Sequence, residues 1–251
     1  MAASLRGVCA ALGRTGSVSL CRDILGFTGF KIPAAANNTR PAPVLSINRF
    51  VRLLRGKHFH VHLILAGSEM FTGKDMSRID YEVFRLREIY AAAGIGIGIV
   101  SGEGRPAANS AGHAVIRTRA DVERTSHDIT ANGNFIPVVI PADMTSNLIA
   151  EDGTVKVGFG LSPIGGPCSP RNAELNSVVI DFDGDPMSRT LAHEVGHFLG
   201  ARHPSSTPGT NLMAQNADFS GDSFFATTIT ESDRNIMLAH PCVMRPGLAG
   251  I

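Results

Sequence analysis

The residues best suited to chemistry lie at positions 193–203, which read His-Glu-Val-Gly-His-Phe-Leu-Gly-Ala-Arg-His. On a helix, His193 and His197 are four residues apart, so both imidazoles project from one face and can bind one metal ion. Gly200 can end that helix in a left-handed conformation, which turns the chain so that His203 approaches the same ion. Three neutral nitrogen ligands and an open fourth position form the pattern of a catalytic zinc site.

Glu194 adds an acid–base group to this predicted zinc site. Its place next to His193 lets the carboxylate reach a water in the open coordination position, as a general base for hydrolysis must. A bare His-x-x-x-His could equally be two histidines on a helix surface, but the longer pattern makes that alternative weak. The sequence therefore predicts Glu194 as the catalytic base and one zinc ion as the cofactor.

The histidine motif resembles that of the metzincin clan of zinc metallopeptidases, in which a methionine-containing turn follows. Asn211-Leu212-Met213 follows His203 after a stretch rich in Ser, Pro, Thr and Gly, which is typical of a loop. Met213 resembles the Met-turn methionine, whose side chain forms an apolar floor beneath the zinc in that clan. Without the histidine motif, a core role for Met213 would be the simpler explanation.

The resemblance extends from about residue 57 to residue 242 and implies an α+β, metzincin-like fold. Such a fold has a twisted mixed β-sheet with an antiparallel edge strand, an active-site helix, a backing helix, and a small C-terminal subdomain with the Met-turn and a final helix. Periodicity predicts strands at 60–66, 95–100, 135–140, 155–161 and 177–182. Helices are predicted at 76–93, from about Pro186 through the histidine motif, and at 231–239 after a Thr230 cap. Pro137 argues against a central position for the third strand.

The antiparallel edge strand of metzincins pairs with an extended substrate, and its best match here is 154–161. The candidate substrate-binding residues on it are Gly158, Phe159 and Gly160. An unpaired strand edge can bind a peptide through main-chain hydrogen bonds that are indifferent to the peptide's sequence. We therefore expect a protein or peptide substrate, although the glycines could instead mark a bend with no ligand.

The sequence departs from known metzincin subfamilies in two ways. Astacins and serralysins place a zinc-binding tyrosine shortly after the Met-turn, whereas residues 214–216 read Ala-Gln-Asn and the two tyrosines, Tyr81 and Tyr90, precede the motif. Residues 158–166 and 177–181, with the start of the histidine motif, look most like pappalysin-type enzymes. Those enzymes carry a different Met-turn and additional cysteines after the helix, so the subfamily stays open.

The chain has four cysteines, Cys9, Cys21, Cys168 and Cys242. A disulfide between Cys168 and Cys242 would connect the loop before the zinc helix to the C-terminus, and a pair of free buried thiols is the alternative in a cytosolic protein. A cysteine near the N-terminus could block the zinc as a thiolate, as in matrix metalloproteases. The switch motif of that family is absent around both Cys9 and Cys21.

Residues 1–56 are expected to form a partly disordered N-terminal extension, and residues 57–251 the catalytic domain. Asp23 is the only acidic residue in the extension, which carries several arginines and fits either a pro-segment or a targeting segment. No stretch predicts a signal peptide or a membrane span, and the localisation is left unassigned. The net charge of +1 gives no electrostatic case for binding nucleic acid. The oligomeric state is left open.

Two other groups could bind metal. His58, His60 and His62 alternate on the first strand and could chelate zinc, but no acidic residue lies nearby and a polar strand face is the favoured interpretation. Three aspartates between 181 and 185 resemble part of a calcium loop, although turn and helix-cap roles are favoured and calcium is not assigned.

Two functions of different class remain for the predicted zinc site. The first is a zinc metalloendopeptidase that hydrolyses proteins or peptides, and the second is a catalytically inert zinc-containing binding or structural module. Glu194 favours the enzyme, because a module without catalysis has no need of a general base.

Overall fold

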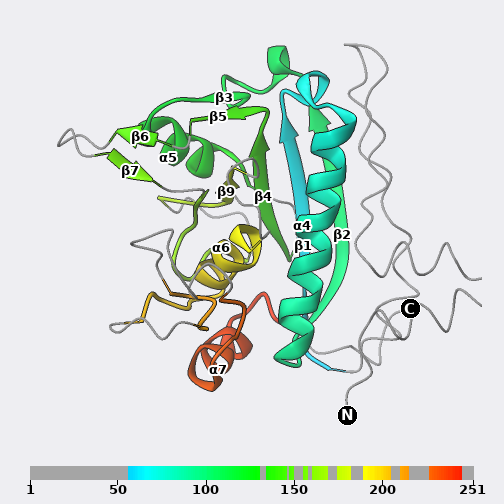
Figure 1. The fold of residues 1–251 in the computed structure, drawn as a ribbon, viewed down its shortest axis with the longest axis vertical. Helices are drawn as coiled ribbons and strands as arrows, with labels where there is room; N and C mark the ends of the chain where they lie inside the picture. The colour runs from blue at the N-terminus through cyan, green and yellow to red at the C-terminus, as the bar shows by residue number, and fades with distance from the viewer. Residues whose placement is uncertain are drawn as a thin grey trace, which may run out of the picture.

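The computed structural model describes residues 56–130, 134–145, 147–149, 155–157, 160–168, 174–181, 189–204, 210–214 and 226–244. A five-stranded sheet with the order β2-β1-β4-β9-β8 lies at its centre (Figure 1). Its strands are β1 (His58–Ala66), β2 (Gly96–Arg105), β4 (Phe135–Pro141), β8 (Gly160–Leu161) and β9 (Val178–Ile180). All pairs are parallel except β8 with β9, so β8 is an antiparallel edge strand. The predicted fold class, a mixed sheet with helices and an antiparallel edge, is confirmed.

Within the described residues, four α-helices and several short elements surround this sheet. The helices are α4 (Gly73–Ala92), α5 (Arg119–Asp128), α6 (Thr190–Phe198) and α7 (Glu231–Ala239). Two small sheets pair β3 (Val115–Ile116) with β5 (Asp143–Met144) and β6 (Asn147–Ile149) with β7 (Val155–Val157). Short 3-10 helices, η1 (Ser68–Met70) and η2 (Ala107–Asn109), complete the list. Within the described part of the chain, none of the helices has the length and apolar character needed to span a bilayer.

The helices cover both faces of the sheet. α4 runs along β1 and β2 in Figure 1, and α4 and α6 pack on the face of β1 that carries Phe59, Val61, Leu63 and Leu65. The side chains of α5 pack on the opposite face, against Ile64 and its neighbours. The connection from β1 to β2 moves one way across the sheet and the connection from β2 to β4 moves the other way. Right-handed crossovers therefore place α4 and α5 on opposite faces.

α4 is longer than the predicted helix because its capping residues precede the apolar pattern. Thr72 is the N-cap: its hydroxyl accepts from the amide of Asp75 at 3.3 Å, and the Asp75 carboxylate accepts from the amide of Thr72 at 2.7 Å. A stripe at spacings of three and four residues is buried on the sheet, consisting of Met76, Ile79, Val83, Leu86 and Tyr90. Each such side chain contributes about 1.5–3 kcal/mol by leaving water. Gly94, with φ of 71°, follows the end of the helix.

The prediction that β4 would not be central was wrong, because β4 lies between β1 and β9. Pro137 is opposite His62 in the β1 register, and the pairing with β9 begins one residue later, at Val138 and Val178. Proline has no backbone N–H donor, but its carbonyl oxygen can still accept a hydrogen bond. A central strand can therefore accept it where the ladder to one neighbour has not yet begun.

The predicted strand 154–161 is two strands in two different sheets. β7 pairs with β6, whereas β8 pairs with β9 at the edge of the main sheet. α7 begins after Thr230 as predicted, and its N-cap hydroxyl accepts from the amide of Asp233 at 3.2 Å. The predicted start of α6 at Pro186 and the N-terminal extension up to residue 55 lie outside the described residues.

Candidate active site

The three predicted ligands converge in space. The Nε2 atoms of His193, His197 and His203 lie 3.0 to 3.2 Å from one another. An ion held at zinc–nitrogen distances of about 2.0–2.1 Å with tetrahedral angles would place such nitrogens about 3.3 Å apart. The donor set therefore fits zinc with little movement. His193 and His197 are buried and His203 is exposed, so the site opens to solvent on the side of His203.

Backbone carbonyls fix the tautomers of the two helical histidines. His193 Nδ1 lies 2.7 Å from the carbonyl oxygen of Leu212, and His197 Nδ1 lies 2.8 Å from that of Ala201. Because a carbonyl oxygen only accepts, each Nδ1 must carry the proton and donate it. Each Nε2 then presents its lone pair to the centre of the triangle, as a metal ligand requires.

Burial also keeps these rings in their neutral form. Loss of hydration lowers the pKa of His193 to about 3 and the pKa of His197 to about 4. Burial lowers the pKa of His203 as well, and the nearby guanidinium of Arg189 adds to that shift. At neutral pH, protons therefore compete weakly with a metal ion for these nitrogens.

The turn that releases His203 from the helix is formed by Gly200, as predicted. Gly200 has φ of 97°, which a residue with a Cβ atom seldom adopts. Its amide donates to the carbonyl oxygen of His197 at 2.8 Å, and the amide of Ala201 donates to that of Gly196 at 3.0 Å. These bonds close the last turn of α6 and redirect the chain toward the metal-binding side.

Met213 lies beneath α6, consistent with the predicted Met-turn. It is fully buried, and a Cβ atom at Gly196 would lie 2.5 Å from the Met213 sulfur. Gly196 is between His193 and His197 in the helix, so the Met213 side chain packs against the part of α6 that carries these two candidate ligands. The turn is held by the Asn211 carboxamide oxygen, which accepts from the Met213 amide at 2.8 Å.

Glu194 is almost completely buried and faces the edge strand. A Cβ atom at Gly160 in β8 would lie 2.6 Å from Cγ of Glu194 and 2.8 Å from Oε1. Only glycine therefore lets this strand pass over the carboxyl group without displacing it. Burial raises the pKa of Glu194 to about 8, while the guanidinium groups of Arg189 and Arg119 act in the opposite direction.

Two residues that the sequence patterns did not single out position α6. The hydroxyl of Tyr90 in α4 donates to the carbonyl oxygen of Ala192 at 3.0 Å, which ties α6 to its backing helix. Arg189 donates from its guanidinium to the carbonyl oxygens of Ala214 at 3.0 Å and Ala226 at 3.5 Å. It therefore joins the start of α6 to the Met-turn. All three bonds connect residues remote in sequence, and no local pattern signals them.

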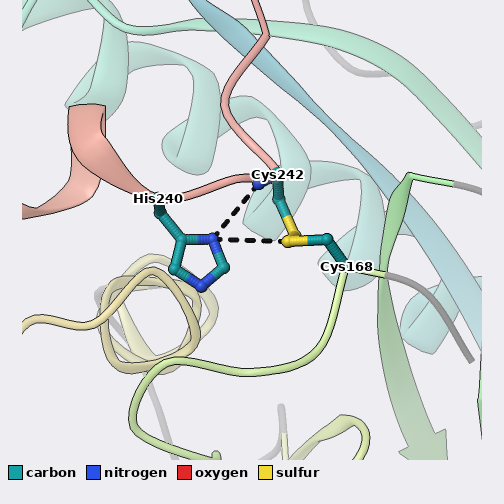
Figure 2. Close-up of side chains that lie close together, drawn as sticks. All are labelled: Cys168, His240 and Cys242. Atoms are coloured by element: carbon teal, nitrogen blue, oxygen red, sulfur yellow. Dashed lines mark hydrogen bonds between the residues drawn. A yellow bond between two sulfur atoms is a disulfide. The ribbon is translucent and has the colours of Figure 1, made fainter. Parts of the chain in front are cut away.

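The loop between β8 and Cys168 covers the other end of α6. The amides of Gly165 and Gly166 donate to the carbonyl oxygens of His197 and Phe198 at 3.0 and 2.8 Å. The His197 carbonyl oxygen, which also accepts from Gly200, and the Phe198 carbonyl oxygen both lie at the end of the helix, where intrahelical donors run out. Cys168 forms a disulfide with Cys242, so this loop is joined covalently to the segment after α7 (Figure 2).

Of the remaining metal candidates from the sequence, the described histidines of β1 do not converge on one point. Gly158 and Phe159 lie outside the described residues, as do Cys9, Cys21 and two of the three aspartates proposed for calcium. His58 and His60 lie side by side on β1 with ring centroids 5.1 Å apart, and His62 Nδ1 is 2.7 Å from the hydroxyl of Ser101. In the described part of the chain, these strand histidines form no group of three ligand atoms close enough to share an ion.

Comparisons with known proteins add structural likeness only. No family model and no curated protein matches the chain. Archaemetzincin from Methanopyrus kandleri superposes with a TM-score of 0.45 and 14% identity over 73% of this chain and 95% of its own. Metalloproteinase-II from Bacteroides fragilis gives 0.46 and 16% over 88% of this chain and 60% of its own. Likeness at this level supports no inference about activity.

Proposed function

We propose that this chain is a zinc-dependent metalloendopeptidase that hydrolyses peptide bonds of proteins or peptides. The observation that carries the proposal is the convergence of three Nε2 atoms within 3.2 Å, with a buried carboxyl group on the adjacent residue. His193, His197 and His203 would hold the ion. Zinc bound by three neutral nitrogens lowers the pKa of a coordinated water and polarises a substrate carbonyl.

Glu194 is proposed as the general base. Its raised pKa reflects burial, and a divalent cation beside it would favour the ionised form and lower that pKa. As a carboxylate it can accept a proton from the attacking water at Oε1 or Oε2, and as a carboxylic acid it can return the proton to the departing amine. The absence of a side chain at Gly160 leaves room for this carboxyl group.

β8 is proposed to bind the substrate backbone. Among the described strands its one partner is β9, and we propose that a peptide pairs with its other edge. An extended peptide pairing there would pass beside Glu194, because Gly160 lies against that side chain. Main-chain pairing would place no strong requirement on substrate sequence, which suits a peptidase acting on unfolded chains.

The Glu194→Gln variant tests the proposal. The glutamine is nearly isosteric and is no ligand, so we expect one zinc ion per chain by elemental analysis in both forms. Casein hydrolysis should fall by about three orders of magnitude or more, since both the base and the acid are lost. A hydroxamate, which chelates zinc, should inhibit the unsubstituted protein.

The assay should include both the full chain and a chain that begins at Gly56, because an N-terminal pro-segment would hold the full chain inactive. Equal rates for Glu194→Gln and its parent would contradict the catalytic role. A zinc-loaded chain from Gly56 that cleaves nothing in a broad peptide library would favour the inert zinc-containing module instead.

A further inference from the structure

A second group of metal-binding side chains lies at the opposite end of α6 from Arg189. Cys168 ends the loop that covers α6, and His240 and Cys242 follow α7 (Figure 2). The Nδ1 atom of His240 lies 3.6 Å from the Cys168 sulfur, and the Cys242 amide donates to the same nitrogen at 3.4 Å. The three potential ligand atoms all lie within 4.8 Å of one another.

The distances suit zinc once the sulfurs are thiolates. Zinc–sulfur bonds of about 2.3 Å and zinc–nitrogen bonds of about 2.0–2.1 Å place sulfur and nitrogen about 3.6 Å apart in a tetrahedral site. The His240 to Cys168 separation of 3.6 Å already has this value. The two sulfurs must move apart, to about 3.8 Å, which side-chain rotation after bond cleavage allows.

The imidazole of His240 is oriented as a ligand. Nδ1 accepts from the Cys242 amide, so this nitrogen is the unprotonated one, and zinc would replace that 3.4 Å contact as the partner of its lone pair. The ring also interacts with the backbone of Gly166, in the loop that covers α6. Two thiolates and one imidazole form a donor set that selects zinc over calcium or magnesium.

We propose that Cys168, His240 and Cys242 form a second zinc site that is filled when the disulfide is reduced. A dithiol reductant supplies two electrons and two protons, becomes a disulfide itself, and leaves Cys168 and Cys242 as thiols. Zinc binding to both thiols then releases those two protons. The loop is thus held to the segment after α7 by a covalent bond in oxidising surroundings and by a metal ion in reducing ones.

The site at Cys168, His240 and Cys242 contacts the same helix, α6, that carries His193 and His197. Gly165 and Gly166, which bond the last carbonyls of α6, precede Cys168 by three and two residues. A Cβ atom at Gly166 would lie 2.3 Å from the ring of Phe198, so the loop lies directly on the final turn of the helix. The ring of His240 contacts the same phenylalanine, with centroids 6.2 Å apart. A disulfide or a metal ion at Cys168 therefore restrains the helical turn that carries His197.

Cobalt titration tests the proposal, because thiolate ligands give Co²⁺ an intense near-ultraviolet charge-transfer absorption that histidine ligands do not. The protein should carry Cys9→Ser and Cys21→Ser, so that no other thiol contributes. After reduction by a dithiol and anaerobic removal of the reductant, we expect two Co²⁺ per chain with this absorption. The oxidised protein should bind one without it.

Two further variants separate this site from the first. Adding His193→Ala and His197→Ala should leave one Co²⁺ per reduced chain, with the absorption retained. His240→Ala should leave the oxidised protein unchanged and weaken binding of the second Co²⁺ at least about tenfold after reduction. Because the readout is metal absorption, a failure here is distinct from a failure of peptidase activity.

Three results would overturn the proposal. The first is a reduced protein that shows no thiolate absorption. The second is a His240→Ala protein whose thiolate absorption rises at the same Co²⁺ concentration as in the protein that keeps His240. Reduction by a phosphine, which adds no thiolate, should also be carried out with Co²⁺ present, which covers a reduced chain that unfolds without metal. The third is the absence of a second Co²⁺ under that condition.

Discussion

Two sets of three histidines lie in this molecule, and only one of them converges. On α6 and the following turn, the Nε2 atoms of His193, His197 and His203 approach within 3.2 Å. On β1, His58, His60 and His62 share one face of the strand, yet His62 turns to Ser101 and no shared ion position results among the described residues. The helical set has carbonyl partners that fix each Nδ1 of His193 and His197, whereas alternation on a strand provides only a common face. Histidine spacing therefore predicts a metal site only together with the groups that orient the rings.

The most severe test of this contrast removes two histidines from each set. His193→Ala with His197→Ala should lower the zinc content of purified protein from about one ion per chain to near zero, because only one ligand remains. His58→Ala with His60→Ala is the matched control and should retain its zinc. Full retention in the first variant, or loss of zinc in a folded form of the second, would reverse the assignment of the two sets.

Gly160→Ala examines how closely the edge strand approaches the helical set. The new methyl group would lie 2.6 Å from Cγ of Glu194, so the carboxyl group must shift. We expect casein hydrolysis to fall by about a hundredfold with zinc retained, since small misplacements of catalytic groups have effects of that size. Ser162→Ala, close by in the same segment, is the control. A Gly160→Ala protein as active as its parent would place the working position of Glu194 elsewhere.

Acid should destabilise the metal-free protein through both sets. Burial, with the neighbouring His58 second, lowers the pKa of His60 to about 4 from an ordinary value of 6.5. The unfolded chain therefore binds a proton that the folded chain does not, and the free energy of unfolding falls as the pH drops from 6.5 toward 4. His60→Gln should remove up to about 3 kcal/mol of this fall, measured by denaturant unfolding at several pH values.

The same measurement distinguishes the two sets when zinc is added. Zinc should oppose the acid effect of His193 and His197, whose pKa values are also lowered, but not that of His60. An equally steep pH dependence in His60→Gln would argue against a role of His60 in acid sensitivity.

Met213→Leu should have the smallest effect. Leucine is close to methionine in volume, so the variant should keep its zinc and lose less than about 1.5 kcal/mol of unfolding free energy. Met213→Ala, which leaves a cavity beneath Gly196, should cost about 2–5 kcal/mol. Complete metal loss in a folded Met213→Leu protein would show that the sulfur does more than fill space.

The candidate ligands could be predicted from sequence because the geometry that joins them is local. A spacing of four on a helix and a left-handed Gly200 bring His193, His197 and His203 together, whereas the Leu212 carbonyl oxygen that orients His193 comes from a separate segment. Tyr90 could not be predicted, because its bond to Ala192 spans 102 residues. The catalytic role of Glu194 and the substrate role of β8 remain predictions.

The secondary structure could be predicted less completely where glycines or polar residues interrupt the apolar periodicity. β2 extends to Arg105, five residues beyond the prediction, because glycines at 102 and 104 interrupt its apolar alternation. α5 was missed although Thr118 and Asp121 form a capping box at its start, since a mostly polar sequence follows. The central place of β4 depends on its register with β1 and β9, which no property of Pro137 alone could reveal.

The packing at Gly196 has a consequence for oxidative damage. A Cβ atom there would meet not only the sulfur of Met213 but also the terminal methyl of Met237, at 3.1 Å, and both methionines are fully buried. A sulfoxide oxygen on either thioether would have no space in this layer and would bring a polar group into it. Peroxide can therefore reach these sulfurs only when the layer opens. The rate of inactivation by peroxide should therefore match the rate at which α6 opens, as measured by hydrogen exchange. The folded state itself then protects the two methionines beneath this helix from oxidation.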